Sequence, residues 1–226
     1  ALRSACCRSA SVTGVVWVGY LVVHMLGNLQ IFMGAEAIDA WARLLHANSG
    51  LLWTFRAVLL LAFAMHFVAA FTLWKASRID ARPVAYHRHQ SVAASYAGRT
   101  MVWTGPIVLA FVVYHLAHFT VRLGHPEWSE HTFTLLNGTK VRDVHAMMVQ
   151  GFSNVPVSIF YIIAVGLLSY HLAHGIVSML QTLGLKNEQW TRGLERFAVA
   201  YCWGYFLLNA AIPLAVVLCM VPLVHS

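Results

Sequence analysis

Five long apolar stretches alternate with polar segments along the chain. Each is long enough to cross a bilayer as a helix, which takes roughly 20 apolar residues, and together they cover residues 12–33, 51–74, 101–121, 156–182 and 197–223. No Asp or Glu falls inside any of these stretches. The pattern predicts an all-α integral membrane protein in which residues 1–226 form a single domain with five transmembrane helices.

The composition excludes a soluble protein. Hydrophobic residues make up 59% of the 226 positions and charged residues only 10%, against roughly 25% charged in soluble domains. Fibrous, secreted and disordered classes are excluded on the same grounds. A net charge of +7 would suggest nucleic acid in a soluble protein, but membrane proteins concentrate Lys and Arg in their cytoplasmic loops. We therefore expect no nucleic-acid partner.

The distribution of basic residues predicts the orientation. Five crossings place the two ends of the chain on opposite sides of the membrane. Most of the 15 basic residues precede the first stretch or follow the second and fourth, namely Arg3, Arg8, Lys75, Arg78, Arg82, Arg88, Arg99, Lys186, Arg192 and Arg196. Because cytoplasmic loops carry this excess, the N-terminus is predicted to be cytoplasmic.

The longest connecting segment, residues 122–155, carries two local signals. Asn137-Gly138 is typical of a tight turn. The semi-apolar run from Val141 to Phe152 predicts a helix lying flat in the membrane interface.

The ionisable residues inside the stretches are nearly all histidine. Such residues are expensive to bury in a bilayer and are usually functional. Each of the first four stretches carries at least one, whereas the fifth has none before its end: His24, His66, His115 with His118, and His171 with His174. Pumps and secondary transporters normally need intramembrane carboxylates, so their absence from the stretches disfavours these classes.

Neutral imidazole binds a metal without carrying charge into lipid. Two imidazoles can hold a haem iron while the apolar macrocycle packs between helices, so four such helices can hold two b-type haems. Histidines that hydrogen-bond across the bundle or line a wet cavity are the other interpretation. That interpretation is sufficient for a single intramembrane histidine, but it is less suitable when each of four consecutive stretches carries one. His118 and His174 each follow a stronger candidate by three residues. We therefore expect each of them to contact a haem propionate or a quinone, or to serve only in helix packing.

Depth along the helices favours one pairing of the four main candidates. At 1.5 Å per residue, His24 and His115 lie about 18 and 21 Å from the cytoplasmic ends of their stretches, and His66 and His171 about 13 and 16 Å. The depths favour pairing His24 with His115 and His66 with His171, at two levels about 5 Å apart.

Two motifs resemble a known family. They are His24-Met25-Leu26-Gly27-Asn28-Leu29-Gln30-Ile31-Phe32 and Tyr170-His171-Leu172-Ala173-His174-Gly175, the second followed by Gln181-Thr182-Leu183-Gly184. The similarity continues through Phe111–Phe119 and Gly151–Asn154 and so runs along nearly the whole chain. The chain resembles the diheme cytochrome b (b558-type) membrane-anchor subunit of succinate:quinone oxidoreductase, the succinate dehydrogenase and fumarate reductase family.

The resemblance implies a subunit of respiratory complex II in a bacterial cytoplasmic (inner) membrane. In that family a flavoprotein subunit carrying FAD oxidises succinate, an iron–sulfur subunit relays electrons, and the anchor passes them through two b haems to a membrane quinone. The chain would then belong to an enzyme whose succinate chemistry lies in partner subunits. The quinone is ubiquinone or menaquinone, and no pocket residues are assigned. The basic loop 75–99, with His87 and His89, is the expected docking face for the iron–sulfur subunit.

Carried over by position, the family's axial ligands fall on four histidines. His24 and His115 would hold the haem farther from the soluble subunits, and His66 and His171 the nearer one. Glycines four and thirteen residues after the fourth ligand, Gly175 and Gly184, select His171 over His174. Tyr114 favours His115 over His118.

Other features leave alternatives open. Arg56, Arg99 and Arg122 lie near the ends of stretches, where they would pair with haem propionates or simply snorkel to the interface. A cytochrome b of another respiratory complex, such as a hydrogenase or formate dehydrogenase, is a second function, against which Gly27-Asn28-Leu29-Gln30 argues. A transition-metal transporter with histidine ligands is a third.

Overall fold

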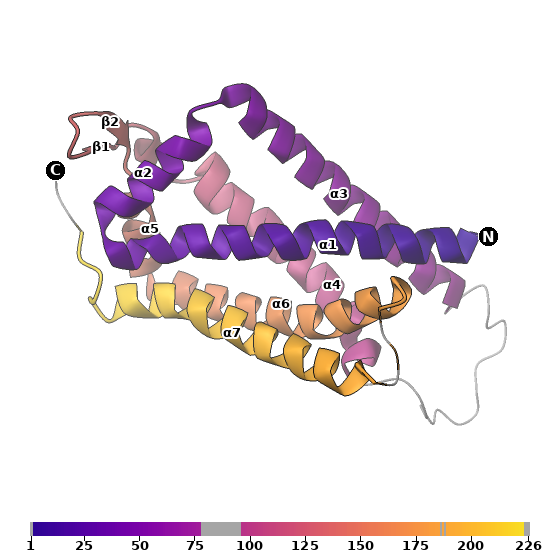
Figure 1. The fold of residues 1–226 in the computed structure, drawn as a ribbon. Coiled ribbons are helices and arrows are strands. Elements are labelled where there is room, and N and C mark those ends of the chain that lie inside the picture. Colours follow the sequence, from indigo (N-terminus) through magenta and orange to yellow (C-terminus); the bar gives the residue numbers. More distant parts are fainter. Residues whose placement is uncertain (1, 78–95, 186, 188, 224–226) are drawn as a thin grey trace.

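The computed structural model describes residues 2–77, 96–185, 187 and 189–223. Five of its helices are long and apolar enough to cross a membrane, and they run in alternating directions (Figure 1). The predicted class, an all-α multi-pass membrane protein, is confirmed. Most of the basic loop expected to dock a partner, including His87 and His89, lies outside the described residues.

The five long helices have bounds close to the predicted stretches. They are α1 (Leu2–Asn28), α3 (Ser49–Lys75), α4 (Tyr96–His115), α6 (Val155–Thr182) and α7 (Thr191–Val217). Helix α1 continues as the 3-10 helix η1 (Leu29–Met33), and α4 continues as the π-helix η3 (Leu116–Val121). η3 ends at Arg122, whose left-handed φ of 61° lets Leu123 N donate to Ala117 O at 2.9 Å, a common helix ending.

Several helix boundaries differ from prediction, among them the start of α4, at Tyr96 rather than residue 101, and the end of α7, at Val217 rather than residue 223. Helix α1 begins ten residues early, at Leu2, because its polar positions are satisfied within the helix: the hydroxyl of Ser11 donates to Cys7 O at 3.0 Å. Helix α7 begins at Thr191 and therefore includes Glu195, which is exposed near its start. Glu195 lies two residues before the predicted stretch 197–223, which itself contains no acidic residue.

Helix α6 lies at the centre of the bundle. It packs against α7, α4 and α1, and α1 in turn packs against α3. Gly166 of α6 allows close approach, because a Cβ there would meet the Phe206 ring of α7 at 3.4 Å. Helix contacts thus follow the order α3, α1, α6, α4. Within the described ranges, neither α1 with α4 nor α3 with α6 forms a closely packed pair.

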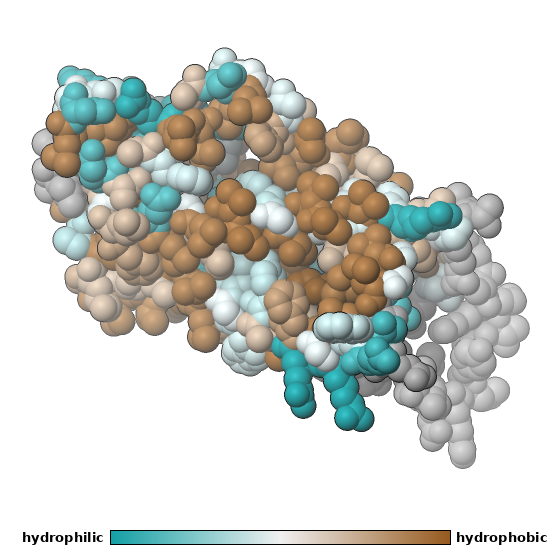
Figure 2. Space-filling model, in the orientation of Figure 1, coloured by the Kyte–Doolittle hydropathy of each residue, from teal (hydrophilic) through white to brown (hydrophobic). Residues whose placement is uncertain are grey.

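The outer surface of the bundle is apolar. On the face shown in Figure 2, hydrophobic residues cover the middle of the molecule and hydrophilic residues gather toward its ends. Large side chains such as Trp103 and Leu61 are 72% and 62% exposed. A soluble protein rarely exposes so much contiguous apolar surface, whereas a spanning helix presents such side chains to lipid.

The short elements gather at the end of the bundle opposite the start of α1, and we call them the cap. They are α2 (Ala35–His46), η4 (Pro126–Ser129), β1 (Thr132–Thr134), β2 (Lys140–Arg142) and α5 (Val144–Ser153) (Figure 1). β1 and β2 form an antiparallel hairpin with Phe133 opposite Val141. The predicted turn at Asn137-Gly138 is confirmed, with Gly138 at φ 78°. The strand pair itself was not predicted.

Helix α5 corresponds to the helix predicted at Val141–Phe152, but it does not lie in the membrane interface. It packs against α2, α6 and α7 and is mostly buried. Its N-terminus is held inside the protein, because Val144 N and His145 N donate to Asp39 Oδ1 at 2.8 and 3.1 Å. Asp143 caps the same helix by accepting from Ala146 N at 2.6 Å. The interfacial prediction is therefore wrong.

Candidate functional site

His24 and His115 lie together near the cap. His24 comes from α1 and His115 is the last residue of α4, and their ring centroids are 5.7 Å apart with the planes at 86°. Two imidazoles on one metal, with metal–nitrogen bonds of about 2 Å and ring radii of about 1 Å, have centroids about 6 Å apart. The observed separation fits that arrangement.

Neighbouring groups contact this pair. Tyr20, one turn earlier in α1, stacks on His24 at 5.4 Å, and Asn28 Nδ2 donates to His24 Nε2 at 3.2 Å. His115 Nδ1 is buried without a hydrogen-bond partner among the described residues. Such an atom is uncommon in folded proteins and calls for an explanation. A metal on His24 Nε2 would replace the hydrogen bond from Asn28.

His66 and His171 are each held through Nδ1 by a threonine hydroxyl. Thr13 Oγ1 lies 3.2 Å from His66 Nδ1, and Thr104 Oγ1 lies 3.1 Å from His171 Nδ1. Each hydroxyl proton has a carbonyl of the preceding turn as its acceptor, at 2.8 Å for Thr13 and 3.4 Å for Thr104. We therefore assign the ring proton to Nδ1, which leaves the Nε2 lone pair available to bind a metal. Histidine ligands usually donate their other N–H in this way.

Helices α1 and α4 repeat one arrangement. Thr13 precedes His24 by eleven residues, and Thr104 precedes His115 by the same number. Eleven residues make close to three turns, so both side chains fall on one face of each helix, about 16 Å apart along its axis. Through their hydrogen bonds, the two threonines lie at the same depth in the bundle as His66 and His171. These two histidines lie within electrostatic range of each other. The molecule thus has two histidine levels.

The separation of these levels is larger than the predicted value of about 5 Å. Helix α1 begins at Leu2 rather than residue 12, which places His24 about 15 Å farther along its helix than estimated. Helix α3 ends at Lys75, close to its predicted end, so the depth of His66 is unchanged. The error comes from the helix start, which hydropathy alone set too late.

Each histidine level joins two helices that are not closely packed. His24 and His115 join α1 to α4, and His66 and His171 join α3 to α6. A large planar group fits best between helices whose backbones stay apart. Across the described part of the chain, no three His, Cys, Asp or Glu side chains gather so as to hold a metal ion. The bundle offers imidazoles in pairs, which is the donor set of a b-type haem.

The two additional histidines have other surroundings. His118 is buried, its Nδ1 hydrogen-bonds with the Tyr161 hydroxyl at 3.0 Å, and its ring lies 5.6 Å from that of Trp128 in the cap. His174 is half-buried on α6, within electrostatic range of His171. The hydrogen bond with Tyr161 accounts for the buried position of His118 without requiring a ligand role.

Arg142 lies near two other arginines at the cap end. Arg142 of β2 is within electrostatic range of both Arg56, near the start of α3, and Arg122, just after η3. Arg56 also lies over the Trp53 ring at 4.9 Å. Arg56 and Arg122 were propionate candidates, whereas Arg142 was missed because it reaches this site only through the unpredicted hairpin. The side chain of Arg99 lies outside the described residues.

Asp39 is a buried carboxylate in the cap. It is 0% exposed, and its Oδ2 atom has no hydrogen-bond partner in the part of the chain that the structure describes. Burial raises the pKa of Asp39 to about 6, although the N–H groups of Val144 and His145 favour its charged form. Burial also lowers the pKa of His145, against the opposite effect of Asp143. Nothing in the sequence distinguishes Asp39 from a surface acid.

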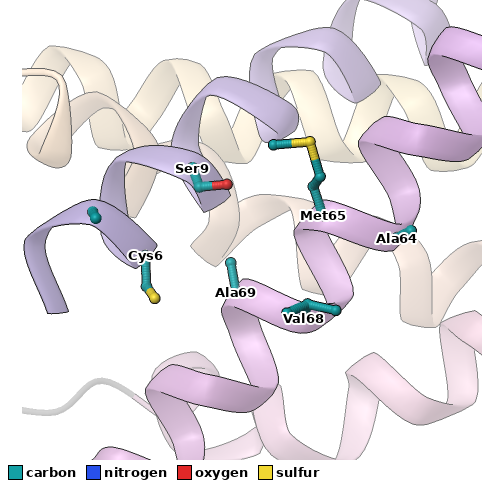
Figure 3. Close-up of a pocket in the computed structure, with 7 residues that line it drawn as sticks. Cys6, Ser9, Ala64, Met65, Val68 and Ala69 are labelled. Atoms are coloured by element: carbon teal, nitrogen blue, oxygen red, sulfur yellow. The ribbon is translucent and has the colours of Figure 1, made fainter. Parts of the chain in front are cut away.

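A pocket of about 420 Å³ lies between α1 and α3 (Figure 3). Its walls are formed by mostly apolar side chains, those of Ala5, Cys6, Ser9, Ala64, Met65, Val68 and Ala69. Met65 directly precedes His66, and Ser9 O accepts the hydroxyl proton of Thr13. The pocket therefore adjoins the Thr13–His66 hydrogen bond and suits an apolar group.

No protein-family model, curated protein or solved structure matches the chain. The fold and the site define a multi-pass, all-α membrane protein with two levels of histidine inside its helix bundle. The roles of His24, His66, His115 and His171 as metal ligands stay predictions.

Proposed function

We propose that the chain is the diheme cytochrome b anchor subunit of a succinate:quinone oxidoreductase. One b haem would bind between His24 and His115, and the second between His66 and His171. The observation that carries the proposal is the repeated Thr-to-His arrangement of α1 and α4, which gives two levels of imidazole about 16 Å apart in one apolar bundle. The family motifs around His24 and His171 support the same assignment.

The proposal is supported by the residue types at both levels, which are those that bis-imidazole haems require, and by the 5.7 Å ring separation of His24 and His115. When bound, these groups supply one-electron carriers at two depths of the membrane. Thr13 and Thr104 orient His66 and His171 and keep the proton on Nδ1, which leaves Nε2 to ligate and makes it more basic. The surrounding apolar side chains limit the access of water, which helps to set the potential of a redox centre.

The orientation of the proposed complex follows from charge. Arg8, Lys75, Arg192 and Arg196 are exposed at the end of the bundle where α1 begins. In the proposal this end faces the cytoplasm of a bacterium and binds the iron–sulfur and FAD-bearing flavoprotein subunits. His66 and His171 are then nearer those subunits, and the cap faces the opposite side. Electrons from succinate would reach ubiquinone or menaquinone in the bilayer.

Purification of the full chain with its native partners tests the proposal. We expect a reduced-minus-oxidised spectrum with a b-type α band, about two extractable haems per chain, and co-purifying flavin with succinate-dependent dye reduction. A haem-bearing chain associated with a hydrogenase or formate dehydrogenase would instead identify the cytochrome of that complex. A colourless protein that binds zinc or copper would refute the haem proposal and favour a metal transporter.

A further inference from the structure

Arg56, Arg122 and Arg142 form a positive cluster without an acidic partner. None of them forms an ion pair with a described residue, and partial burial, together with the charges of Arg122 and Arg56, lowers the pKa of Arg142. Three like charges held within electrostatic range repel one another. A fold keeps such a cluster at a cost unless an anion compensates it.

Arg122 adds a more specific indication. Its Nε atom is buried and has no hydrogen-bond partner among the described residues. Leaving a donor of a charged group buried and unpaired is unfavourable. The guanidinium is a planar fork of N–H donors that matches the two oxygens of a carboxylate or phosphate. The missing partner of Arg122 is therefore expected to be an oxyanion.

No acid in the described part of the cap forms an ion pair with these arginines, and Glu127 pairs instead with His125 at 3.0 Å. Asp39 and Asp143 are committed to backbone N–H groups at the start of α5. Both carboxylate oxygens of Glu36 accept from Leu136 N, at 3.2 and 3.0 Å. The usual bias of basic residues toward the cytoplasm also leaves the cluster unexplained, because it lies at the opposite end of the proposed orientation.

We infer that Arg56, Arg122 and Arg142 together bind an oxyanion beside the His24–His115 level. Arg56 lies within electrostatic range of Tyr20, whose ring stacks on His24. Arg122 follows His115 by seven residues, with η3 between them. The anion has two possible sources that share this chemistry. One is the pair of carboxylates of a haem held by His24 and His115, which rests on the proposed function. The other is the phosphate of an anionic phospholipid.

The test compares variants of the full-length chain, prepared haem-depleted and reconstituted in vesicles. Arg122→Gln and Arg142→Gln remove one charge each, and Arg122→Lys keeps the charge without the fork. Arg43→Gln, at an exposed position of α2 in the same cap, is the matched control. Protohaem and its dimethyl ester probe carboxylate binding. Spin-labelled phosphatidylglycerol in phosphatidylcholine vesicles probes phosphate binding.

If haem carboxylates are the anion, the unmodified chain binds protohaem about tenfold more tightly than the dimethyl ester. The Arg122→Gln and Arg142→Gln variants then lose this preference, Arg122→Lys keeps part of it and Arg43→Gln keeps all of it. If phosphate is the anion, the same pattern is seen with spin-labelled phosphatidylglycerol. Arg142 is an exposed residue at the end of β2, so its variant carries the test if Arg122→Gln fails to fold.

The inference is overturned if the unmodified chain shows neither preference, or if Arg43→Gln loses as much binding as Arg122→Gln. These results can be distinguished from a failure of the proposed function. A chain that binds two haems without any preference for their carboxylates or for phosphatidylglycerol supports the function and refutes the oxyanion site. A chain that binds no haem but selects phosphatidylglycerol through these arginines supports the oxyanion site and refutes the proposed function.

Discussion

Substitution of Thr13 or Thr104 directly perturbs the His66–His171 level. Replacing either with Val removes the hydroxyl but keeps the branched shape, so His66 or His171 loses its Nδ1 partner at 3.2 or 3.1 Å. Loss of a group that orients a metal-ligating histidine typically weakens metal binding about 10- to 100-fold. This corresponds to about 1.4–2.8 kcal/mol of haem affinity. The unsatisfied N–H adds about 1–3 kcal/mol of destabilisation.

The assay is transfer of haem from the detergent-solubilised protein to excess apomyoglobin, followed in the Soret region. We expect each variant to release one of its two haems about 10- to 100-fold faster, and the same haem in both, because both threonines act at one level. Thr13→Ser keeps the hydroxyl and should behave like the unmodified chain. Thr72→Val is the control, because that hydroxyl donates to Val68 O at 2.8 Å and forms no hydrogen bond with any histidine that the structure describes. Unchanged release in both Thr→Val variants, or equal acceleration by the control, would refute the reasoning.

Three further predictions concern the cap and its contact with η3. Because the pKa of Asp39 is raised from 3.8 to about 6, the folded cap is most stable below about pH 4 and loses up to about 3 kcal/mol as the pH rises through 6. Hydrogen exchange of α5 amides, corrected for the intrinsic pH effect, should show this slope, and Asp39→Asn should remove it; a variant that keeps the slope would exclude Asp39 as its source. Gly151→Ala would place a Cβ 2.9 Å from the Phe119 ring and should lower thermal stability in detergent by about 1–3 kcal/mol. Gly193→Ala, with nothing within 4 Å, should not, and equal effects would contradict the packing argument. His118→Phe removes the 3.0 Å hydrogen bond to Tyr161 and should cost about 1–3 kcal/mol of stability while both haems are retained, whereas loss of a haem would make His118 a ligand.

Hydropathy was sufficient to predict the bundle. Five apolar stretches correspond to five spanning helices, because bilayer thickness fixes the length of a crossing and backbone hydrogen bonding requires a helix. The start of α1 was missed by ten residues, since Arg8 and Ser11 lower the hydropathy of this segment but donate to carbonyls of their own helix. That error carried directly into the estimated spacing of the histidine levels.

The sequence alone could not predict the fold of the cap or the threonines that form hydrogen bonds with His66 and His171. Helix α5 has an apolar pattern that fits a membrane interface and a protein interior equally well, and the burial of Asp39 at its N-terminus decides between them. Thr13 and His66 are 53 residues apart, and Thr104 and His171 are 67 apart. Their contacts depend on the rotation and tilt of four helices, which hydropathy does not report.

In the proposed function, two haems are held by two specific pairs of histidines. The most direct measurement is the haem content and difference spectrum of His24→Ala, His115→Ala, His66→Ala and His171→Ala beside the unmodified chain. We expect two haems in the unmodified chain, loss of one spectral component in both His24→Ala and His115→Ala, and loss of the other in both His66→Ala and His171→Ala. An unmodified chain without Soret absorption despite ample haem supply would contradict the proposal, as would a His171→Ala variant that retains both haems.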